Sequence, residues 1–129
     1  MEYSILVCDD DPEIRAAMRR TLYRFDVTTV ESAAQALAKL RDHRFHAVVS
    51  DFNLDSDQDG LQLLQMVRVL YPDTARFLVT GNTDLHVAIR ALNEGAVHRF
   101  FLKPWDDDQL VGTIEIALHT SSRASTPTP

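Results

Sequence analysis

Residues 5–10 read ILVCDD, an apolar run that ends in two carboxylates, Asp9 and Asp10. Three other apolar runs also end in a reactive or polar side chain: residues 47–51 (AVVSD), 77–80 (FLVT) and 100–104 (FFLKP). Short runs of this kind are typical of strands buried in a parallel sheet. The carboxyl ends of such strands line one crevice, where ligands bind. The sequence therefore predicts one crevice that collects Asp9, Asp10, Asp51, Thr80 and Lys103.

Amphipathic helical patterns alternate with these apolar runs. Pro12, the capping-box pattern of residues 32–35 (SAAQ) and Asp106 signal helix starts, and Gly95 is a natural helix end. A weaker run, residues 27–30 (VTTV), suits an edge strand. The alternation predicts an α/β fold: a doubly wound, five-stranded parallel sheet of the flavodoxin-like order 2-1-3-4-5, with five helices.

Length and composition fit one globular domain. The chain has 129 residues, of which 45% are apolar and 25% charged. We assign residues 1–119 to this domain and expect residues 120–129, rich in Ser, Thr and Pro, to form a disordered tail or linker. The net charge of −6 argues against nucleic acid as a direct partner. No run approaches the roughly 20 apolar residues of a membrane span, so we expect no membrane partner and a cytoplasmic location.

The predicted cluster of charges indicates its chemistry. Three carboxylates side by side repel one another unless a cation lies among them. A divalent metal, a lysine and a hydroxyl around an exposed carboxylate are the groups that phosphoryl transfer requires. The single cysteine, Cys8, lies within an apolar run, and we interpret it as a small buried strand residue.

From Ser4 to Leu118 the chain resembles the receiver domain of two-component response regulators. Four motifs in order carry the resemblance: residues 6–15 (LVCDDDPEIR), residues 48–51 (VVSD) with Asp59-Gly60 downstream, residues 79–81 (VTG) and residues 101–104 (FLKP). Each motif alone is weak, but their order and their spacing across the domain are highly specific.

The resemblance implies a role for each residue of the crevice. Asp51 would be the phosphoacceptor, taking a phosphoryl group from a sensor histidine kinase or a histidine phosphotransfer protein. Mg²⁺, for which Mn²⁺ can substitute, would be bound by Asp10, by Asp9 directly or through water, by Asp51 and by the backbone carbonyl of Asn53. Lys103 would neutralise phosphoryl oxygens. Thr80 would donate a hydrogen bond to one of them.

The resemblance also implies a switch rather than a metabolic enzyme. On phosphorylation Thr80 would move towards the phosphoryl group, and Phe100 would fill the space that it leaves. The face formed by the fourth helix, fifth strand and fifth helix would change shape. Its reader would be a downstream protein or a fused output domain beyond Pro129, and a phosphorylation-dependent homodimer would be a further form of the signal.

Two departures from the family concern the segments beside the site. The segment between Asp51 and Asp59 is longer, more acidic and free of proline, and it can alter kinase docking or metal affinity. Gly81 replaces the usual alanine after the threonine.

Two alternative interpretations remain open. Residues 55–60 (DSDQDG) match the first half of an EF-hand calcium loop, although Met66 stands at its twelfth position, where a bidentate glutamate is needed. A haloacid-dehalogenase-like phosphatase would use Asp9 as nucleophile and Asp11 as its second carboxylate. The adjacent Pro12 and the lack of a cap domain argue against that enzyme.

The remaining polar and aromatic residues receive structural interpretations. Asp11 is expected to cap the first helix, and Trp105 to pack over the end of the domain. The histidines show no zinc-type spacing and are interpreted as solvated surface residues: His43, His46, His86, His98 and His119.

Overall fold

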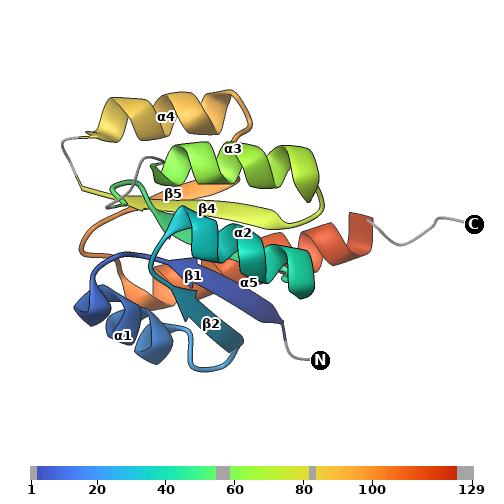
Figure 1. Cartoon of the computed structure of the whole chain (residues 1–129), viewed down its shortest axis with the longest axis horizontal. Coiled ribbons are helices and arrows are strands. Elements are labelled where there is room, and N and C mark those ends of the chain that lie inside the picture. Colours follow the sequence, from blue (N-terminus) through green and yellow to red (C-terminus); the bar gives the residue numbers. More distant parts are fainter. Residues whose placement is uncertain (1–2, 55–58, 82–83, 125–129) are drawn as a thin grey trace, which may run out of the picture.

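A computed structural model of the chain describes residues 3–54, 59–81 and 84–124. Within these ranges five strands alternate with five helices (Figure 1). The strands are β1 (Ser4–Cys8), β2 (Asp26–Val30), β3 (Ala47–Asp51), β4 (Ala75–Thr80) and β5 (Arg99–Leu102). The helices are α1 (Pro12–Thr21), α2 (Ala33–Asp42), α3 (Gly60–Leu70), α4 (Leu85–Asn93) and α5 (Asp107–Ala124).

The strands form one parallel sheet in the order β2-β1-β3-β4-β5. All four pairings are parallel, and Val7 of β1 lies opposite Val49 of β3. Every residue of β3 and β4 is buried, whereas β2 is largely half-exposed, as an edge strand can be. The predicted fold class and strand order are confirmed.

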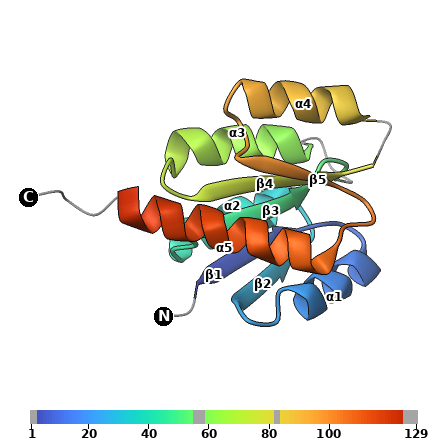
Figure 2. The same cartoon turned by 180° about the vertical axis from the view of Figure 1, so that it is seen from behind.

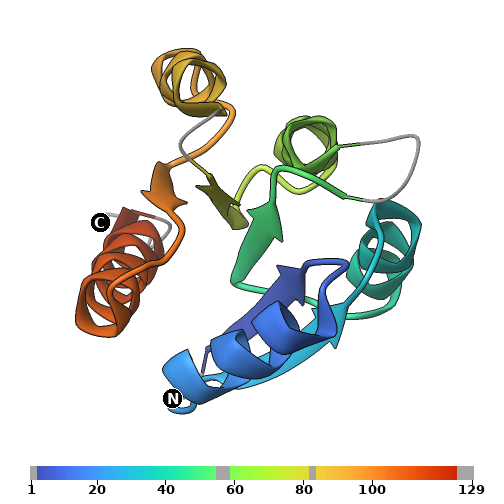
Figure 3. The same ribbon diagram turned by 90° about the vertical axis from the view of Figure 1, so that its left-hand side faces the viewer.

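Helices cover both faces of the sheet (Figures 2 and 3). Successive strand residues point to opposite faces. Thus Leu6 packs in an apolar cluster with residues of α2, α3 and α4. Its neighbour Val7 packs in a second cluster with residues of α1 and α5. This two-sided burial holds the strands in one register and aligns their carboxyl ends.

Helix termini follow the sequence signals. Asp11 is the N-cap of α1 and accepts a hydrogen bond from the Glu13 N–H at 2.9 Å. Asp59 and Gln62 form a reciprocal capping box at the start of α3. Gly95, just beyond α4, has φ 79°, the left-handed conformation that glycine adopts without steric cost. The predicted roles of Asp11 and Gly95 are therefore confirmed.

The last helix extends further than the composition of the C-terminal segment indicates. Residues 120–129 are predicted to be a disordered tail, yet α5 continues to Ala124, five residues past position 119. An existing helix adds one hydrogen bond for each further residue, so it can continue into a polar segment. Residues 125–129 lie outside the described ranges. None of the described helices is both long and apolar enough to cross a membrane.

Two histidines are bound to the backbone rather than merely solvated. His46 precedes β3, is half-buried, and accepts a hydrogen bond at Nδ1 from the Ser4 N–H at 3.0 Å. His98 precedes β5 and accepts one at Nδ1 from the Arg76 N–H at 2.9 Å, although part of its ring is exposed. The surface interpretation is thus wrong for the half-buried His46, whereas His98 is exposed as predicted and has only its Nδ1 bound to the backbone.

Candidate functional site

The carboxyl edge of the sheet collects the predicted residues. Asp9 directly follows β1, Asp51 is the last residue of β3, Thr80 ends β4, and Lys103 directly follows β5. Parallel strands in register bring these four positions to the same edge, as the spacing of the apolar runs predicts.

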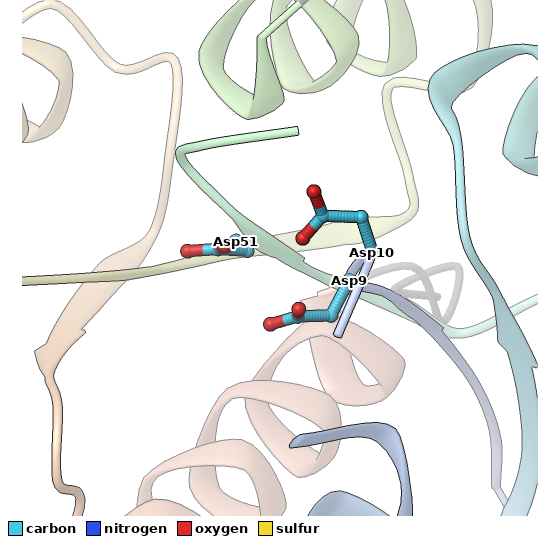
Figure 4. Close-up of side chains that lie close together, drawn as sticks. All are labelled: Asp9, Asp10 and Asp51. Carbon is cyan, nitrogen blue, oxygen red and sulfur yellow. The ribbon is translucent and has the colours of Figure 1, made fainter. Parts of the chain in front are cut away.

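Three carboxylates meet there. Asp9, Asp10 and Asp51 each offer a carboxylate oxygen, and these oxygens lie within 4.8 Å of one another. Figure 4 shows the three side chains converging from the ends of two neighbouring strands. Asp9 is 3% exposed and Asp51 is 7% exposed, whereas Asp10 is open to solvent. The cluster is therefore buried at Asp9 and Asp51 and accessible to solvent at Asp10.

Lys103 is the cation of the described site. Its Nζ lies 3.1 Å from Asp51 Oδ1 and 3.5 Å from Asp9 Oδ2. Burial lowers the pKa of Lys103, but the Asp51 and Asp9 carboxylates outweigh burial and raise the pKa overall. The side chain therefore stays a charged ammonium at neutral pH, bridging two carboxylates without neutralising the third.

The negative charges of Asp9 and Asp51 remain unfavourable despite the nearby Lys103. Burial, followed by the charge of Asp9, raises the pKa of Asp51. Burial also raises the pKa of Asp9, against hydrogen bonds from Asp11 and Lys103. Burial and the same carboxylates raise the pKa of the Cys8 thiol to about 12, so this buried strand residue stays protonated. A site that disfavours its own negative charge stabilises an added cation.

The donor set fits a hard divalent cation. Three carboxylates offer oxygen ligands, which Mg²⁺ prefers, and the exposure of Asp10 leaves room for the waters that Mg²⁺ retains. In the described residues the cluster holds carboxylates without thiolate or imidazole, which would favour Zn²⁺. Asn53, predicted as a backbone ligand, is exposed two residues beyond Asp51.

Backbone and helix contacts hold Asp9 in place. Its Oδ1 accepts a hydrogen bond from the Asp11 N–H at 2.9 Å. Its backbone carbonyl accepts one from Arg15 Nη1 at 2.8 Å. Asp11 itself caps α1 and is not part of the carboxylate cluster of the described residues. The pairing of Asp9 with Asp11 that a haloacid-dehalogenase-like site requires is therefore not favoured.

Thr80 is linked to a carboxylate that the sequence analysis did not identify. Its side chain is fully buried, and its hydroxyl lies 3.4 Å from Asp84 Oδ2 and 3.4 Å from the Gly81 carbonyl. Asp84 is the N-cap residue of α4, but its side chain makes no capping hydrogen bond. Asn53 Nδ2 donates to the same Asp84 Oδ2 at 3.3 Å. The only sequence signal was an acidic residue just before a helix.

Gly60 allows α3 to start against the end of β3. A Cβ at position 60 would collide with the backbone carbonyl of Asp51, so a side chain is excluded there. The Gly60 N–H donates to the Phe52 carbonyl at 2.8 Å, and Asp59 caps the helix. The Asp59-Gly60 pair therefore sets the close approach of α3 to Asp51.

Phe100 and Trp105, the two aromatic residues given roles in the sequence analysis, pack in different apolar clusters. Phe100 is half-buried and packs against the apolar cluster beneath α2, α3 and α4. Trp105 packs against the opposite cluster, as predicted, and its indole nitrogen also donates hydrogen bonds to Thr21 and Asp107.

The structure argues against the calcium-loop alternative. Its residues 55–58 and the predicted effect of the long loop lie outside the described ranges. The segment that precedes this loop is β3, where an EF-hand requires a helix.

Known proteins share both the sequence pattern and the fold. The profile of the response regulator receiver domain matches residues 5–115. The hydrogenase transcriptional regulatory protein HoxA of Bradyrhizobium diazoefficiens is 34% identical over 116 residues, covering 89% of this chain and 24% of HoxA. The C4-dicarboxylate transport transcriptional regulatory protein DctD of Rhizobium meliloti is 38% identical over 110 residues, covering 84% of this chain and 24% of DctD. This chain thus spans about a quarter of these relatives.

Solved structures agree. The signal receiver domain of an HD domain-containing protein from Pseudomonas fluorescens Pf-5 has a TM-score of 0.87 and 31% identity, covering 95% of this chain and 99% of that one. NtrX from Brucella abortus has a TM-score of 0.88 and 31% identity, covering 96% of this chain and 29% of NtrX.

Proposed function

Because this chain belongs to the response regulator receiver domain family, we propose that it accepts a phosphoryl group on Asp51 and relays its presence to a partner. The observation that carries the proposal is the position of the Lys103 ammonium, 3.1 Å from Asp51 and 3.5 Å from Asp9 at an open carboxylate cluster. This arrangement combines a carboxylate nucleophile with a fixed positive charge, which phosphoryl transfer requires.

The transfer step follows from the chemistry of a phosphohistidine donor. A carboxylate oxygen of Asp51 forms a bond to phosphorus as the bond between phosphorus and the imidazole nitrogen breaks. The imidazole keeps the electron pair of the broken bond, and the product is an acyl phosphate. Lys103 stabilises the charge that spreads over the phosphoryl oxygens, and Thr80 donates to one of them.

Asp9, Asp10 and Asp51 would hold a divalent metal, Mg²⁺ or Mn²⁺, with the backbone carbonyl of Asn53 as a further ligand. Such an ion supplies positive charge to the phosphoryl oxygens during transfer. The elevated pKa values of Asp9 and Asp51 support this assignment, since their repulsion is relieved when a cation is bound.

The switch would begin at Thr80, because its hydroxyl has one hydrogen to donate and lies 3.4 Å from two acceptors, Asp84 Oδ2 and the Gly81 carbonyl. A phosphoryl oxygen competes for that hydrogen and carries more negative charge than a carboxylate. When Thr80 turns towards it, the contact with the N-cap residue of α4 is lost. Phe100 then fills the vacated space, and the face of α4, β5 and α5 changes its population of shapes.

The partners follow from the family. The phosphodonor would be a sensor histidine kinase or a histidine phosphotransfer protein. HoxA and DctD are transcriptional regulatory proteins about four times as long as the matched segment, so a fused output domain fits their pattern. A downstream protein would bind the same face, and a homodimer formed on phosphorylation would use it as its interface.

A phosphorylation assay tests the proposal. Wild type is incubated with acetyl phosphate and Mg²⁺ and analysed by intact mass, with Asp51→Asn beside it. The exposed Asp73→Asn serves as a matched control outside the cluster. We expect a phosphoryl adduct on wild type and Asp73→Asn and none on Asp51→Asn, and chelation of the metal should abolish it. An adduct of equal yield on Asp51→Asn would refute the assignment.

A further inference from the structure

Three side chains form a closed hydrogen-bonded ring between the end of α1 and the segment after Lys103. The Thr21 hydroxyl donates to Asp107 Oδ1 at 2.7 Å. The Trp105 indole N–H lies 3.1 Å from the Thr21 hydroxyl and 3.0 Å from the same Asp107 oxygen. We call Thr21, Trp105 and Asp107 the Trp105 clamp. Its hydroxyl accepts one bond and donates another, so each bond polarises the next.

The clamp runs from the core to the surface, because Thr21 is buried, Trp105 is half-buried and Asp107 is exposed. Thr21 is buried, and Trp105 packs against the apolar cluster that α1 and α5 form on the sheet. Asp107 is the first residue of α5, where a carboxylate is favoured by the helix dipole. The clamp therefore joins the end of α1, the start of α5 and the segment that links β5 to α5.

The N-terminal end of α1, opposite the end that carries Thr21, contacts the carboxylate cluster. Arg15 donates to the Asp9 backbone carbonyl at 2.8 Å, and Asp11 caps the helix while its N–H donates to the Asp9 carboxylate. One helix thus positions Asp9 through its first turns and the segment after Lys103 through its last residue.

Lys103 depends on such an anchor because only one side of its backbone is held by the sheet. Its N–H donates to the Thr80 carbonyl at 2.8 Å, after which the chain leaves β5. The lysine stem is flexible, and its ammonium must reach both Asp9 and Asp51. Trp105, two residues later, is the next side chain that binds to a separate helix.

We propose that the Trp105 clamp positions the Lys103 ammonium for phosphoryl transfer to Asp51. Thr21, Trp105 and Asp107 are positioning residues that act through the backbone of Lys103. This inference rests on the proposed function and adds three residues that determine the rate of phosphoryl transfer to Asp51.

The first experiment compares two substitutions of one residue. Thr21→Val keeps the shape of the side chain and removes its hydroxyl, whereas Thr21→Ser keeps the hydroxyl. Thr113→Val on α5 is the matched control for the same chemical change. With acetyl phosphate and saturating Mg²⁺, we expect Thr21→Val to be phosphorylated roughly tenfold more slowly, the scale of a sub-ångström misplacement. Thr21→Ser and Thr113→Val should keep the wild-type rate.

Two further readouts separate positioning from general loss of stability. Mg²⁺ affinity should be the same in Thr21→Val and wild type, because Lys103 is not a metal ligand. Trp105 is the only tryptophan of the chain, so its emission maximum reports the loss of the indole hydrogen bond directly. Trp105→Phe, which removes that N–H and keeps an aromatic ring, should slow phosphorylation as Thr21→Val does, and it supplies the test if Thr21→Val does not fold.

A double-mutant cycle tests whether the effect passes through Lys103. In a Lys103→Ala background, where phosphorylation is followed over longer times, Thr21→Val should cause no further slowing. Equal slowing in both backgrounds, or wild-type rates in both Thr21→Val and Trp105→Phe, would overturn the inference. If wild type itself acquires no phosphoryl group on Asp51, the proposed function fails instead, so the two failures are distinguishable.

Discussion

The Thr80 hydroxyl lies 3.4 Å from Oδ2 of Asp84, so the buried side chain that ends β4 is linked to the N-cap residue of α4. Asn53 donates to the same carboxylate oxygen from the segment after Asp51. Asp84 thus connects the segment after Asp51, the proposed switch residue Thr80 and helix α4. While its side chain serves these donors, it makes no capping bond to the N–H groups of α4.

Replacing Asp84 should make the switch easier to operate. In Asp84→Ala the Thr80 hydroxyl loses one of its two acceptors, so less interaction is lost when it turns to a phosphoryl oxygen. We expect beryllofluoride, a phosphoryl mimic, to bind about threefold more tightly in the presence of Mg²⁺, the size of one net hydrogen bond. Calorimetric titration measures this affinity, with the exposed Asp73→Ala as control. Weaker binding by Asp84→Ala would show that Asp84 supports the phosphorylated state.

Gly60→Ala should destabilise the protein strongly. Its new methyl group would collide with the Asp51 carbonyl, and that atom belongs to a buried backbone rather than a flexible side chain. We expect a loss of about 2–3 kcal/mol in the free energy of unfolding by urea. The control is Gly112→Ala in α5, where a Cβ meets nothing within 4 Å. That substitution should stabilise by about 0.5–1 kcal/mol, and a similar loss in both variants would contradict the steric argument.

Stability should decrease as the pH falls below the ordinary histidine pKa of about 6.5. Partial burial and Arg44 lower the pKa of His46. Burial, followed by Arg76, lowers the pKa of His98. The unfolded chain therefore binds protons that the folded chain resists, so stability is greatest above the unfolded pKa and is lost as pH falls towards the folded one. Solvent exposure of the His98 ring reduces its share of the effect.

The double variant His46→Asn, His98→Asn isolates this effect, because the asparagine oxygen can replace Nδ1 as acceptor and does not titrate in this range. Urea unfolding between pH 5 and 7.5 should show a flatter pH dependence than wild type. The exposed His119→Asn should keep the wild-type slope. Asp9 and Asp51, whose pKa values are raised, act with the opposite sign at lower pH and cancel in the comparison. Identical slopes for double variant and wild type would contradict the prediction.

Asp51→Asn should raise the melting temperature in the absence of a divalent metal. Burial and Asp9 raise the pKa of Asp51, which means that its charged form costs stability at neutral pH. Neutral asparagine removes that cost. Added Mg²⁺ should stabilise wild type by mass action and should stabilise Asp51→Asn less. Thermal unfolding with EDTA and with Mg²⁺ gives all four values, and a lower melting temperature for metal-free Asp51→Asn would show that the Lys103 contact outweighs the repulsion.

The fold and the carboxylate cluster could be predicted because each depends on local patterns. Asp9, Asp51 and Lys103 each follow an apolar run, and parallel strands carry such positions to one edge whatever the details of packing. The end of α5 could not be predicted in the same way. Composition described residues 120–124 as a tail, whereas an existing helix continues cooperatively into them.

The contacts of His46 and His98 also could not be predicted from the sequence. His46 and His98 have no distinctive spacing, and their role as hydrogen-bond acceptors comes from strands that lie beside them only in the fold. The residues joined to them, Ser4 and Arg76, are 42 and 22 positions away. Local sequence patterns do not reveal contacts between residues this far apart.

By itself the sequence determined the order of the strands, the two-sided burial of the sheet and the gathering of Asp9, Asp10, Asp51 and Lys103 at one edge. These features depend on which residue types follow one another, and periodicity records that directly. Only the tertiary structure decided that Asp84 accepts from Thr80 and that Trp105 binds Thr21, 84 positions away. The physical reason is that a hydrogen bond requires an approach within about 3.5 Å, and the packing of helices on the sheet decides which polar groups come that close.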